Sequence, residues 1–560
     1  MGHQGSPGRP VAPGVRGTAV VSPARRAELR RAGLWGDASL DDYWRLSVLA
    51  APEQEAVVDS RGSRLTYAEV DDRAARIATW LHGHGIGAGD VVSVQLPSWA
   101  EMLCVDVACL RIGAVVNPVL TAYRERELLE VLTRSRSRAL LVPTRFRGAD
   151  LEPVAARLAA GLDHLVAVAA VAHNGRPATE VPDLAEIVAT HEPLPEDLRR
   201  PGRGEDVAAV LFTSGSEARP KGVLLSHDNV LSGERGFARV LGIGHGDRVL
   251  MPAPLGHATG YLHGLTLPYL VGATALLLDV PTGPSAVAMI RAEGATCGMA
   301  AASVVRCMLD SCAPGEPVGE HLRFLCCGGS PVPRSLAREA LDHGVRLLSV
   351  YGSTESAPHT LTTPSDDLER VLTTDGRPVP GVEVRVVDPV TREPLPVGEV
   401  GEAASRGPQV FCGYLDDPEL TAAVLDADGW YYSGDLAQLD AEGYLRIVGR
   451  AKDVIIRGGE NISAAELEQV LRGCPGVRDA AVVAMPDRRL GECVCAYLVL
   501  EPGAAAPDVP ALREQFLARG LAKYKIPAHV EVVDALPLSP AGKVRKDVLR
   551  ERAAALVPAG

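Results

Sequence analysis

Apolar runs alternate with amphipathic segments through most of the chain. From about Ala32 onward, short apolar runs such as residues 91–96 and 113–118 predict buried strands, and residues 99–110 and 125–134 have the pattern of amphipathic helices. Strands that alternate with helices in this order favour a mostly parallel sheet covered by helices. The first and larger part of the chain is therefore predicted to have an α/β fold.

The pattern changes in the last third of the chain. Around residues 395–402 the strands become short and are separated by Gly, Pro and Asp, which is typical of a small barrel-like lobe. A last piece begins near Lys452 and mixes both kinds of pattern. It predicts helices at residues 464–472 and 511–519 and strands at residues 480–484 and 496–500.

One apolar stretch, residues 262–280, is long enough to raise the question of a membrane helix. It is interrupted by His263, Gly264, Pro268 and Gly272. A membrane span needs about 20 residues with few interruptions of this kind. The stretch is therefore predicted to be a buried strand–helix segment, and no integral membrane segment is expected.

Composition narrows the class of protein. At 560 residues the chain exceeds one ordinary core, and its net charge of −13 argues against nucleic-acid or anionic-membrane partners. The 11 cysteines are scattered without zinc-type spacing, and no signal peptide is recognisable, so a cytoplasmic protein is expected. Residues 1–25 are rich in Gly, Pro and Arg and are predicted to be a disordered N-terminal extension.

The most informative motif is the loop at residues 212–222. A buried run, residues 207–211, leads into hydroxyl-bearing and glycine residues and then into Lys221. Backbone N–H groups, hydroxyls and one ammonium can together hold a polyphosphate. The loop is not the usual nucleotide P-loop, because Pro220 precedes the lysine and Gly222 follows it. Taken alone, such a loop is either a phosphate site or a simple connector.

Four further motifs follow in order. Each places polar or charged side chains directly after a predicted strand or in a Gly- or Pro-rich loop. Glu355, after the strand at residues 345–351, has the chemistry of a Mg²⁺ ligand, and Asp435 has that of a ribose partner. The motifs span residues 345–356, 429–435, 449–462 and 537–543.

These five motifs, in this order and spacing, resemble those of the adenylate-forming superfamily of acyl-CoA synthetases, peptide-synthetase adenylation domains and luciferases. The resemblance runs from about Leu34 to Arg552 and is nearest to bacterial short/medium-chain fatty acid–CoA ligases and cyclohexanecarboxylate–CoA ligases. It implies a large N-terminal domain of mostly parallel α/β sheets with a small β-barrel-like lobe, residues 26–451. It further implies a small mobile α+β C-terminal domain, residues 452–560, with its hinge at Lys452.

The resemblance also implies the reaction and its ligands. A short/medium-chain or alicyclic carboxylic acid would attack ATP to form an acyl-adenylate and pyrophosphate, and the thiol of coenzyme A would then displace AMP. ATP and Mg²⁺ would be the cofactors, and CoA would be a co-substrate. The implied catalytic residues are Lys543, Glu355, Thr213, Lys221 and His257, and the implied metal ligands are Glu355 and Thr213.

Nucleotide and CoA contacts follow from the same resemblance. Lys543 would bridge the attacking carboxylate and the α-phosphate, and His257 would line the acyl pocket and the path of the thiol. The full implied set is Thr213, Ser214, Gly215, Ser216 and Lys221 for the β- and γ-phosphates, Thr354 for the α-phosphate, Tyr351 and Gly329 for adenine with Ser330, Gly352 and Ser353 beside them, Glu355 for the metal, Asp435 and Arg450 for ribose, Lys543, and Gly458 and Gly459 for pantetheine.

Two points bear on the substrate and the acceptor. Amino-acid-activating relatives carry an Asp in the segment that is residues 254–260 here; this chain has no acid there, which argues against an amino acid. Glu217 and Ala218 replace a Thr-Gly pair that many relatives have, and Glu217 is expected to point away from phosphate.

Two alternative functions stay open: an acyl-AMP ligase that loads a separate acyl carrier protein, and a non-catalytic nucleotide or acyl sensor.

Overall fold

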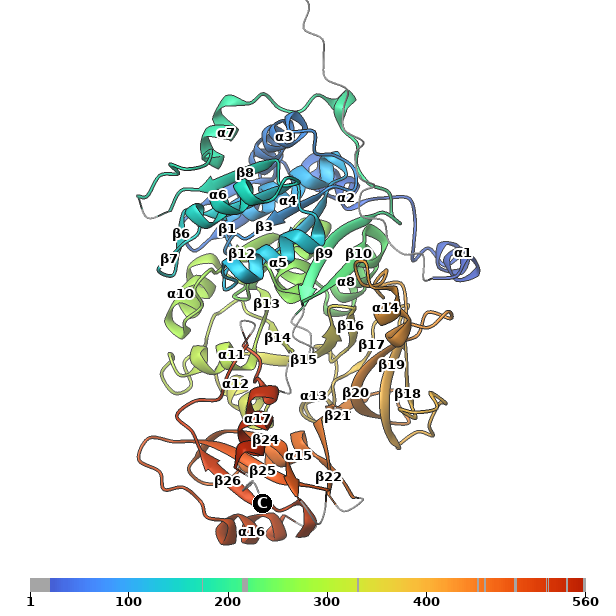
Figure 1. Cartoon of the computed structure of the whole chain (residues 1–560), viewed down its shortest axis with the longest axis vertical. Helices are drawn as coiled ribbons and strands as arrows, with labels where there is room; N and C mark the ends of the chain where they lie inside the picture. Colours follow the sequence, from blue (N-terminus) through green and yellow to red (C-terminus); the bar gives the residue numbers. More distant parts are fainter. Residues whose placement is uncertain are drawn as a thin grey trace, which may run out of the picture.

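The structure is a computed structural model that describes residues 21–173, 175–213, 220–329, 332–450, 453–457, 460–487, 491–519, 521, 523–539 and 542–556. Figure 1 shows three regions stacked along the long axis. Two large sheets with their helices form the upper and middle parts, a small lobe built mainly of β-strands lies at the side, and the C-terminal region forms the other end.

The first large sheet has six strands in the order β10-β9-β4-β3-β5-β8. All neighbouring pairs are parallel except β9 and β10, which form an antiparallel hairpin. The strands of this sheet are β3 (Val91–Val94), β4 (Val115–Pro118), β5 (Ala139–Pro143), β8 (Ala167–Val171), β9 (Val207–Thr213) and β10 (Lys221–Ser226). The accompanying elements are α3 (Tyr67–Gly83), α4 (Ala100–Ile112), α5 (Glu125–Ser135), β6 (Arg145–Phe146), β7 (Ala149–Asp150), α6 (Glu152–Gly161), α7 (Leu184–Thr190) and η1 (Glu196–Leu198). The predicted parallel β-α-β-α arrangement is confirmed.

The second large sheet has nine strands in the order β17-β16-β15-β14-β13-β11-β12-β1-β2. It is parallel from β15 to β1 and antiparallel at both edges. Its strands are β1 (Glu55–Asp59), β2 (Arg64–Thr66), β11 (Arg248–Met251), β12 (Thr274–Leu277), β13 (Cys297–Ala300), β14 (Phe324–Gly328), β15 (Arg346–Ser353), β16 (Ser356–Leu361) and β17 (Arg377–Pro378). Its helices are α2 (Leu40–Ala50), α8 (His227–Leu241), η2 (Gly260–Thr266), α9 (Leu267–Val271), α10 (Gly283–Glu293), α11 (Ala302–Leu309), α12 (Arg334–Asp342) and α13 (Leu368–Thr373).

The two large sheets share one hydrophobic core. A single apolar cluster contains Val92 of β3, Val210 of β9 and Met299 of β13, so side chains from both sheets pack against the same helices. Central strands such as β3 and β5 are buried at every position, which is why they read as apolar runs and not as alternating patterns. This shared core fixes the strand ends that carry the motifs.

The apolar stretch at residues 262–280 is buried, as predicted. It comprises most of η2, all of α9 and the strand β12. His263 and Gly264 lie within η2, Pro268 lies in the first turn of α9, and Gly272 caps its C-terminus. Across the described residues, no helix is both long enough and apolar enough to cross a membrane.

The small lobe is an antiparallel sheet in the order β18-β19-β20-β21. Within the described residues its order ends at β18 on one side and β21 on the other, so it is an open sheet where the sequence suggested a barrel-like lobe. Its elements are β18 (Glu383–Val387), β19 (Val400–Arg406), α14 (Pro418–Val424), β20 (Tyr431–Leu439) and β21 (Leu445–Arg450).

The C-terminal region mixes helices with a second mostly antiparallel sheet, in agreement with the predicted α+β pattern. The predicted helix at residues 464–472 matches α15, because Ser463 caps its first turn and Gly473 follows its last residue. The elements are β22 (Val454–Arg457), β23 (Glu460–Ser463), α15 (Ala464–Arg472), β24 (Val477–Asp487), β25 (Gly491–Leu500), α16 (Val509–Ala518), η4 (Lys523–Lys525), β26 (His529–Val532) and α17 (Lys546–Ala555).

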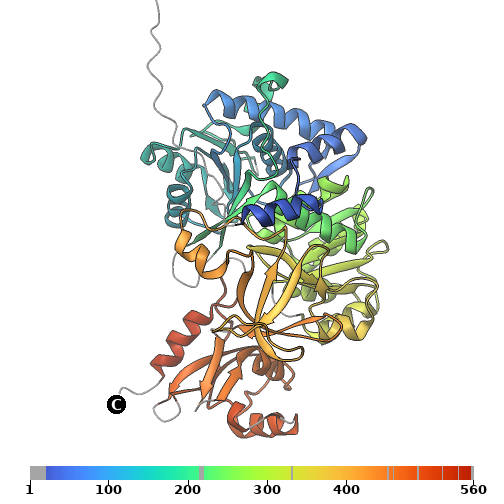
Figure 2. The same cartoon turned by 90° about the vertical axis from the view of Figure 1, so that its right-hand side faces the viewer.

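The N-terminal extension is shorter than the sequence suggested. Helix α1 (Pro23–Arg31) begins inside the predicted extension of residues 1–25, with Ser22 as its N-cap. Figure 2 shows α1 lying along the body of the molecule. The segment that follows α1 is held in place by a hydrogen bond of 2.9 Å that Trp35 Nε1 donates to the Pro408 carbonyl. The prediction of disorder was wrong for residues 23–25, and residues 1–20 lie outside the described part.

Candidate active site

The predicted phosphate loop joins the two strands of a hairpin. Thr213, the last residue of β9, lies opposite Lys221, the first residue of β10. Gly222 follows, and a Cβ there would lie 3.0 Å from Leu415 Cβ, so a side chain at this position would crowd Leu415. Residues 214–219, which include the predicted Ser214, Gly215 and Ser216 as well as Glu217 and Ala218, lie outside the described residues.

Lys221 lies beside Glu355 through Tyr414. The Lys221 ammonium is 5.7 Å from the centroid of the Tyr414 ring, and the Tyr414 hydroxyl donates a 2.8 Å hydrogen bond to Glu355 Oε1. Glu355 occupies the turn between β15 and β16, and its carbonyl accepts a hydrogen bond from the Phe411 amide. Tyr414 thereby contacts both Lys221 of the first motif and Glu355 of the second. Tyr414 was not predicted from the sequence.

A carboxylate held by one phenol and adjacent to a lysine suits a divalent cation that also binds phosphate. Glu355 supplies carboxylate oxygen, and Thr213 supplies a hydroxyl at the mouth of the neighbouring hairpin. Mg²⁺ prefers such oxygen ligands and usually completes its shell with water and substrate phosphates. The residues present therefore fit the predicted metal.

The second group of residues centres on Asp435. Its Oδ2 accepts a 2.9 Å hydrogen bond from the Tyr351 hydroxyl, and its Oδ1 accepts a 2.8 Å hydrogen bond from Arg450 Nε. Asp435 and Arg450 face each other across β20 and β21, so the pairing register of the small lobe positions both. Burial opposes the charge on Arg450, but the nearby Asp435 raises its pKa above the usual value. The sequence predicted these three residues, and the structure brings them together.

Tyr351 is fixed from a second side by a buried histidine. The rings of Tyr351 and His359 are 4.8 Å apart, and burial lowers the pKa of His359 to about 3, so it is neutral near pH 7. Gly352 follows, and a Cβ there would approach the Ser356 carbonyl at 3.2 Å. Ser353 and Thr354 continue into the turn that ends at Glu355.

Lys543 reaches this centre from the C-terminal region. The loop that carries it is held by hydrogen bonds from the Lys543 amide to Ser539 Oγ and from the Ser539 amide to the Lys543 carbonyl, over 3.1 and 2.7 Å. Enclosure by protein lowers the pKa of Lys543, the positive Arg450 lowers it further, and Asp435 and Glu355 oppose both effects. The Lys543 ammonium therefore interacts electrostatically with the carboxylates of Asp435 and Glu355.

His257 lies in the segment that leads into η2 and is close enough to Lys543 for their charges to interact. Burial, together with the positive charge of Lys543, lowers the pKa of His257 to about 4. Its neighbours Gly256 and Gly260 permit tight turns, because a Cβ at either position would meet backbone atoms of Val119 or Pro254 closer than 3.0 Å. His257 is therefore a neutral side chain beside the lysine.

Five predicted positions remain: Gly329, Ser330, Lys452, Gly458 and Gly459. Gly329 has φ of +81°, a backbone conformation that favours glycine, and follows β14. Ser330, the proposed hinge residue Lys452, and the glycines Gly458 and Gly459 lie outside the described residues.

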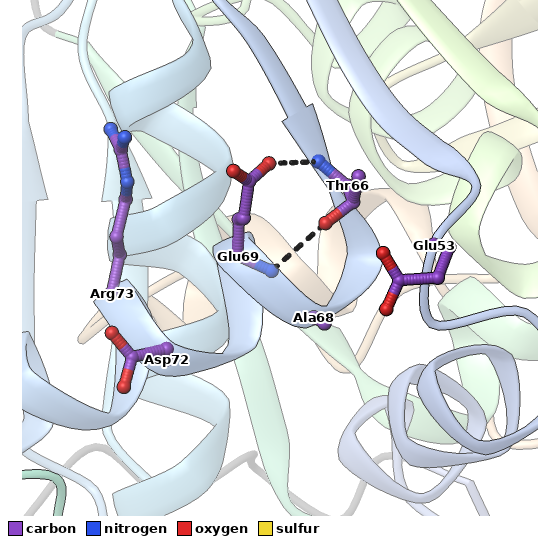
Figure 3. A pocket seen from close by; sticks show the side chains of 6 residues that line it. All are labelled: Glu53, Thr66, Ala68, Glu69, Asp72 and Arg73. Atoms are coloured by element: carbon purple, nitrogen blue, oxygen red, sulfur yellow. Dashed lines mark hydrogen bonds between the residues drawn. The ribbon is translucent and has the colours of Figure 1, made fainter.

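A separate hollow of about 340 Å³ lies on the surface beside the start of α3 (Figure 3). Two of its side chains are already used by the helix cap: the Thr66 amide donates to Glu69 Oε2 over 2.8 Å, and the Glu69 amide donates to Thr66 Oγ1 over 3.2 Å. Its remaining polar groups are mostly acidic. None of the residues that line this hollow belongs to the five motifs, so it is not the candidate site.

Comparison with protein families gives two matches. The model of the AMP-binding enzyme family matches residues 45–415, and that of the AMP-binding enzyme C-terminal domain matches residues 466–543. The first match ends at the loop that follows Tyr414, and the second ends at Lys543. The two matches together contain the whole described candidate site except Asp435 and Arg450.

Known proteins are similar over nearly the whole chain. A medium-chain fatty-acid–CoA ligase from Escherichia coli (strain K12) is 44% identical over 537 residues, covering 95% of this chain and 94% of the relative. Feruloyl-CoA synthase from an Amycolatopsis species is 36% identical over 494 residues, covering 88% and 94%. The crystal structure of ATP-bound MatB from Rhodopseudomonas palustris superimposes with a TM-score of 0.83 at 29% identity, covering 92% and 99%.

A second solved structure includes a reaction intermediate. o-Succinylbenzoate CoA synthetase from Bacillus subtilis, in complex with its acyl-adenylate, matches with a TM-score of 0.80 at 26% identity, covering 92% of this chain and 98% of that one. The resemblance in motifs thus extends to the order and arrangement of the whole fold.

Proposed function

The chain belongs to the AMP-binding enzyme family and is an acyl-CoA synthetase, and we propose that its acid substrate is a medium-chain or alicyclic carboxylic acid. The acid would first form an acyl-adenylate with ATP and then a thioester with coenzyme A. The identity of 44% to a medium-chain fatty-acid–CoA ligase supports this acid class. The absence of an acid at residues 254–260 argues against an amino acid.

The single observation that carries the proposed mechanism is the position of Lys543. It comes from the C-terminal region and interacts electrically with Glu355, Asp435 and His257 of the N-terminal region. A cation at that meeting point can stabilise the charge that develops when the carboxylate attacks the α-phosphorus. Positioning and charge stabilisation are the main demands of phosphoryl-type transfer.

We assign the remaining residues around that step. Thr213 and Lys221, with Ser214, Gly215 and Ser216 of the intervening loop, would hold the β- and γ-phosphates, and Thr354 would contact the α-phosphate. Asp435 and Arg450 would hold the ribose hydroxyls, and Tyr351 and Gly329 would flank adenine. Bound Mg²⁺ would neutralise phosphate charge, with Glu355 and Thr213 as its protein ligands. Ser330, Gly352 and Ser353 would shape the nucleotide loops.

The second half-reaction requires the acceptor thiol to reach the acyl carbon. We propose that residues 26–451 and 452–560 act as two domains, that the smaller one rotates at Lys452, and that pantetheine passes Gly458 and Gly459. The acceptor is proposed to be CoA because the relatives described above are named as CoA ligases or synthetases. No described feature favours a carrier protein. A cytoplasmic location is proposed because the 11 scattered cysteines fit a reducing compartment.

One assay tests the proposed function. Pyrophosphate and AMP release would be followed with Mg·ATP and acids from acetate to decanoate, cyclohexanecarboxylate, benzoate and several amino acids, each with and without CoA. CoA-dependent AMP release with an acyl-CoA product is the expected result, with the highest rates for medium-chain or alicyclic acids. Accumulation of acyl-AMP alone would instead indicate a carrier-protein acceptor, and no release with any acid would indicate a sensor.

Tyr414 provides a test of how Glu355 is held. Tyr414→Phe removes the hydroxyl that donates to Glu355 Oε1 but keeps the ring beside Lys221. Loss of a hydrogen bond to a metal-ligating group typically costs about tenfold to a hundredfold in metal affinity or activity. We expect the Mg²⁺ concentration for half-maximal adenylation to rise by about tenfold, with little change in the KM for the acid.

The matched control is Tyr432→Phe. The Tyr432 hydroxyl donates to Asp426 Oδ2 over 2.9 Å in the small lobe, away from Glu355. This variant loses a comparable phenol–carboxylate bond and is expected to keep the wild-type Mg²⁺ dependence. If both variants shift that dependence equally, Tyr414 acts through general stability and not through Glu355.

A further inference from the structure

A side-chain hydrogen bond crosses the boundary between the small lobe and the C-terminal region. The hydroxyl of Ser463 donates to the carbonyl of Val448 over 2.6 Å. Val448 lies in β21, before the proposed hinge residue Lys452, and Ser463 lies after it, at the end of β23. Arg450, which ends β21, pairs with Asp435 of the candidate site over 2.8 Å. The bond therefore links the strand that carries part of the proposed nucleotide site to the C-terminal region.

The carbonyl of Val448 is available because β21 contains a bulge. Gly449 pairs with Leu436 of β20. Ile447 pairs with Ala437, the next residue of β20, so the pairing register skips Val448. A bulged residue is left out of the ladder of backbone hydrogen bonds. Since β21 is also the last strand in the order of its sheet and contacts β23 and α15, its free edge faces the C-terminal region.

Gly449 makes room for the serine at this edge. A Cβ placed at Gly449 would lie 3.1 Å from Ser463 Oγ, which is closer than an ordinary van der Waals contact. A larger residue at this position would press on the hydroxyl where it meets the carbonyl of Val448. The end of β21 is therefore shaped to admit the Ser463 side chain.

Ser463 is itself fixed to the rest of the C-terminal region. It pairs with Val454 of β22, and its Oγ caps α15 by accepting a hydrogen bond from the Glu466 amide over 3.2 Å. Asp453, directly after the proposed hinge, pairs with Lys546 of α17 over 3.7 Å. The strands and helices that follow the hinge are thus tied to one another, and a rotation at the hinge would carry Ser463 with them.

We propose that Ser463 is a positioning residue that holds the C-terminal region in the arrangement that places Lys543 in the candidate site. The inference rests on the proposed function, including the rotation between its two half-reactions. In this arrangement Lys543 interacts electrostatically with Glu355 and Asp435, as adenylation is proposed to require. A hydrogen bond of 2.6 Å does not survive a displacement of more than about 1 Å, so rotation for thioester formation has to break it.

The test compares the two half-reactions in single turnovers, with the acid that the wild-type enzyme uses best. It measures the rate of thioester formation from supplied acyl-adenylate and CoA, divided by the rate of adenylate formation from acid and ATP. Each rate is proportional to the population of its own arrangement, so the ratio follows the equilibrium between them. A neutral hydrogen bond is worth about two- to tenfold in such an equilibrium. We expect Ser463→Ala and Ser463→Asp to raise the ratio by about fivefold.

The two substitutions differ in their effect on α15. Alanine removes both the helix cap and the hydrogen bond to Val448, whereas ionised aspartate is a good N-cap but has no proton to donate to a carbonyl. Asp508→Ala is the matched control, because Asp508 Oδ1 caps α16 in the same region by accepting from the Ala511 amide over 2.8 Å. It loses a comparable cap and is expected to lower stability without changing the ratio.

A purely structural role for Ser463 gives a different result. Both half-reactions would then fall equally in the Ser463 variants, and the ratio would stay at its wild-type value. That outcome in folded Ser463→Asp overturns the proposal, as does an equal rise of the ratio in Asp508→Ala.

A measurement without turnover separates this inference from the proposed function. Fluorophores attached through non-natural amino acids at Asp428 of the small lobe and Glu514 of α16, both exposed, report the distance between the two regions by energy transfer. We expect the population at a second distance, relative to the first, to rise by about fivefold in both Ser463 variants and to stay unchanged in Asp508→Ala. Identical distributions in all these proteins overturn the proposal. A wild-type enzyme that forms no acyl-CoA from any acid, but whose Ser463 variants show the shift, would refute the proposed function alone.

Discussion

Replacing Lys543 by alanine is expected to reduce the rate of acyl-adenylate formation by a hundredfold or more. The Lys543 ammonium interacts with Glu355 and Asp435 where the α-phosphate is proposed to lie, so its loss removes charge stabilisation from the transition state. Removing one such contact commonly costs about 3 kcal/mol, which is more than a hundredfold in rate. Pyrophosphate exchange or release with octanoate measures this half-reaction directly.

The second half-reaction separates catalysis from folding. If Lys543 acts only in adenylation, the variant should still convert a supplied acyl-adenylate and CoA to acyl-CoA at nearly the wild-type rate. Arg545→Ala is the matched control in the same loop, because Arg545 pairs with Asp547 and is not part of the proposed site. Equal loss of both half-reactions in Lys543→Ala would mean that Lys543 serves docking or folding of the C-terminal region.

The lowered pKa of Lys543 predicts that the rate of adenylation falls at alkaline pH. Enclosure by protein and the positive Arg450 lower its pKa below the usual 10.5. The protonated form is the one that stabilises negative charge, so adenylation is expected to be full below this lowered pKa and to fall as the pH rises through it. Lys543→Arg should shift the fall to higher pH, since arginine stays protonated. A pH profile identical in both forms would assign the limit to another group.

The elements that could be predicted from sequence are those whose signals are local. The helix at residues 464–472 begins after a capping serine and ends before a glycine, and both signals lie within the segment. The strand at residues 345–351 was found because it is apolar, yet it continues to Ser353. That extension depends on pairing between Ser353 and Ser356, which periodicity does not report.

Among the residues of the predicted site, too, some have a local sequence signal and others do not. Glu355, Asp435 and Lys543 each stand in a motif of their own, so the sequence could single them out. Tyr414 has no such signal, because its role arises from a backbone bridge to Val223, far away in the chain, and from the position of Glu355.

Replacing Asp435 by alanine is the second substitution with a large expected effect on activity. Asp435→Ala removes the carboxylate that Tyr351 and Arg450 both contact, and with it the proposed partner of the ribose hydroxyls. Hydrogen bonds to charged groups are worth about 1.5–3 kcal/mol each. The expected result is a kcat/KM for ATP lowered by about a hundredfold, mainly through KM.

Comparing ATP with 2′,3′-dideoxy-ATP as substrates tests whether Asp435 contacts the ribose hydroxyls. The wild-type enzyme should prefer ATP strongly over 2′,3′-dideoxy-ATP, whereas Asp435→Ala should use both almost equally, because the group that distinguishes them is gone. Asp440→Ala is the matched control: Asp440 directly follows β20, pairs with Arg370 over 2.6 Å, and lies at the other end of the same hairpin. A variant at Asp435 that loses activity but keeps the preference for ribose would show that Asp435 only supports Arg450 and Tyr351. The ratio of the two nucleotides thus separates a ribose contact from a structural carboxylate.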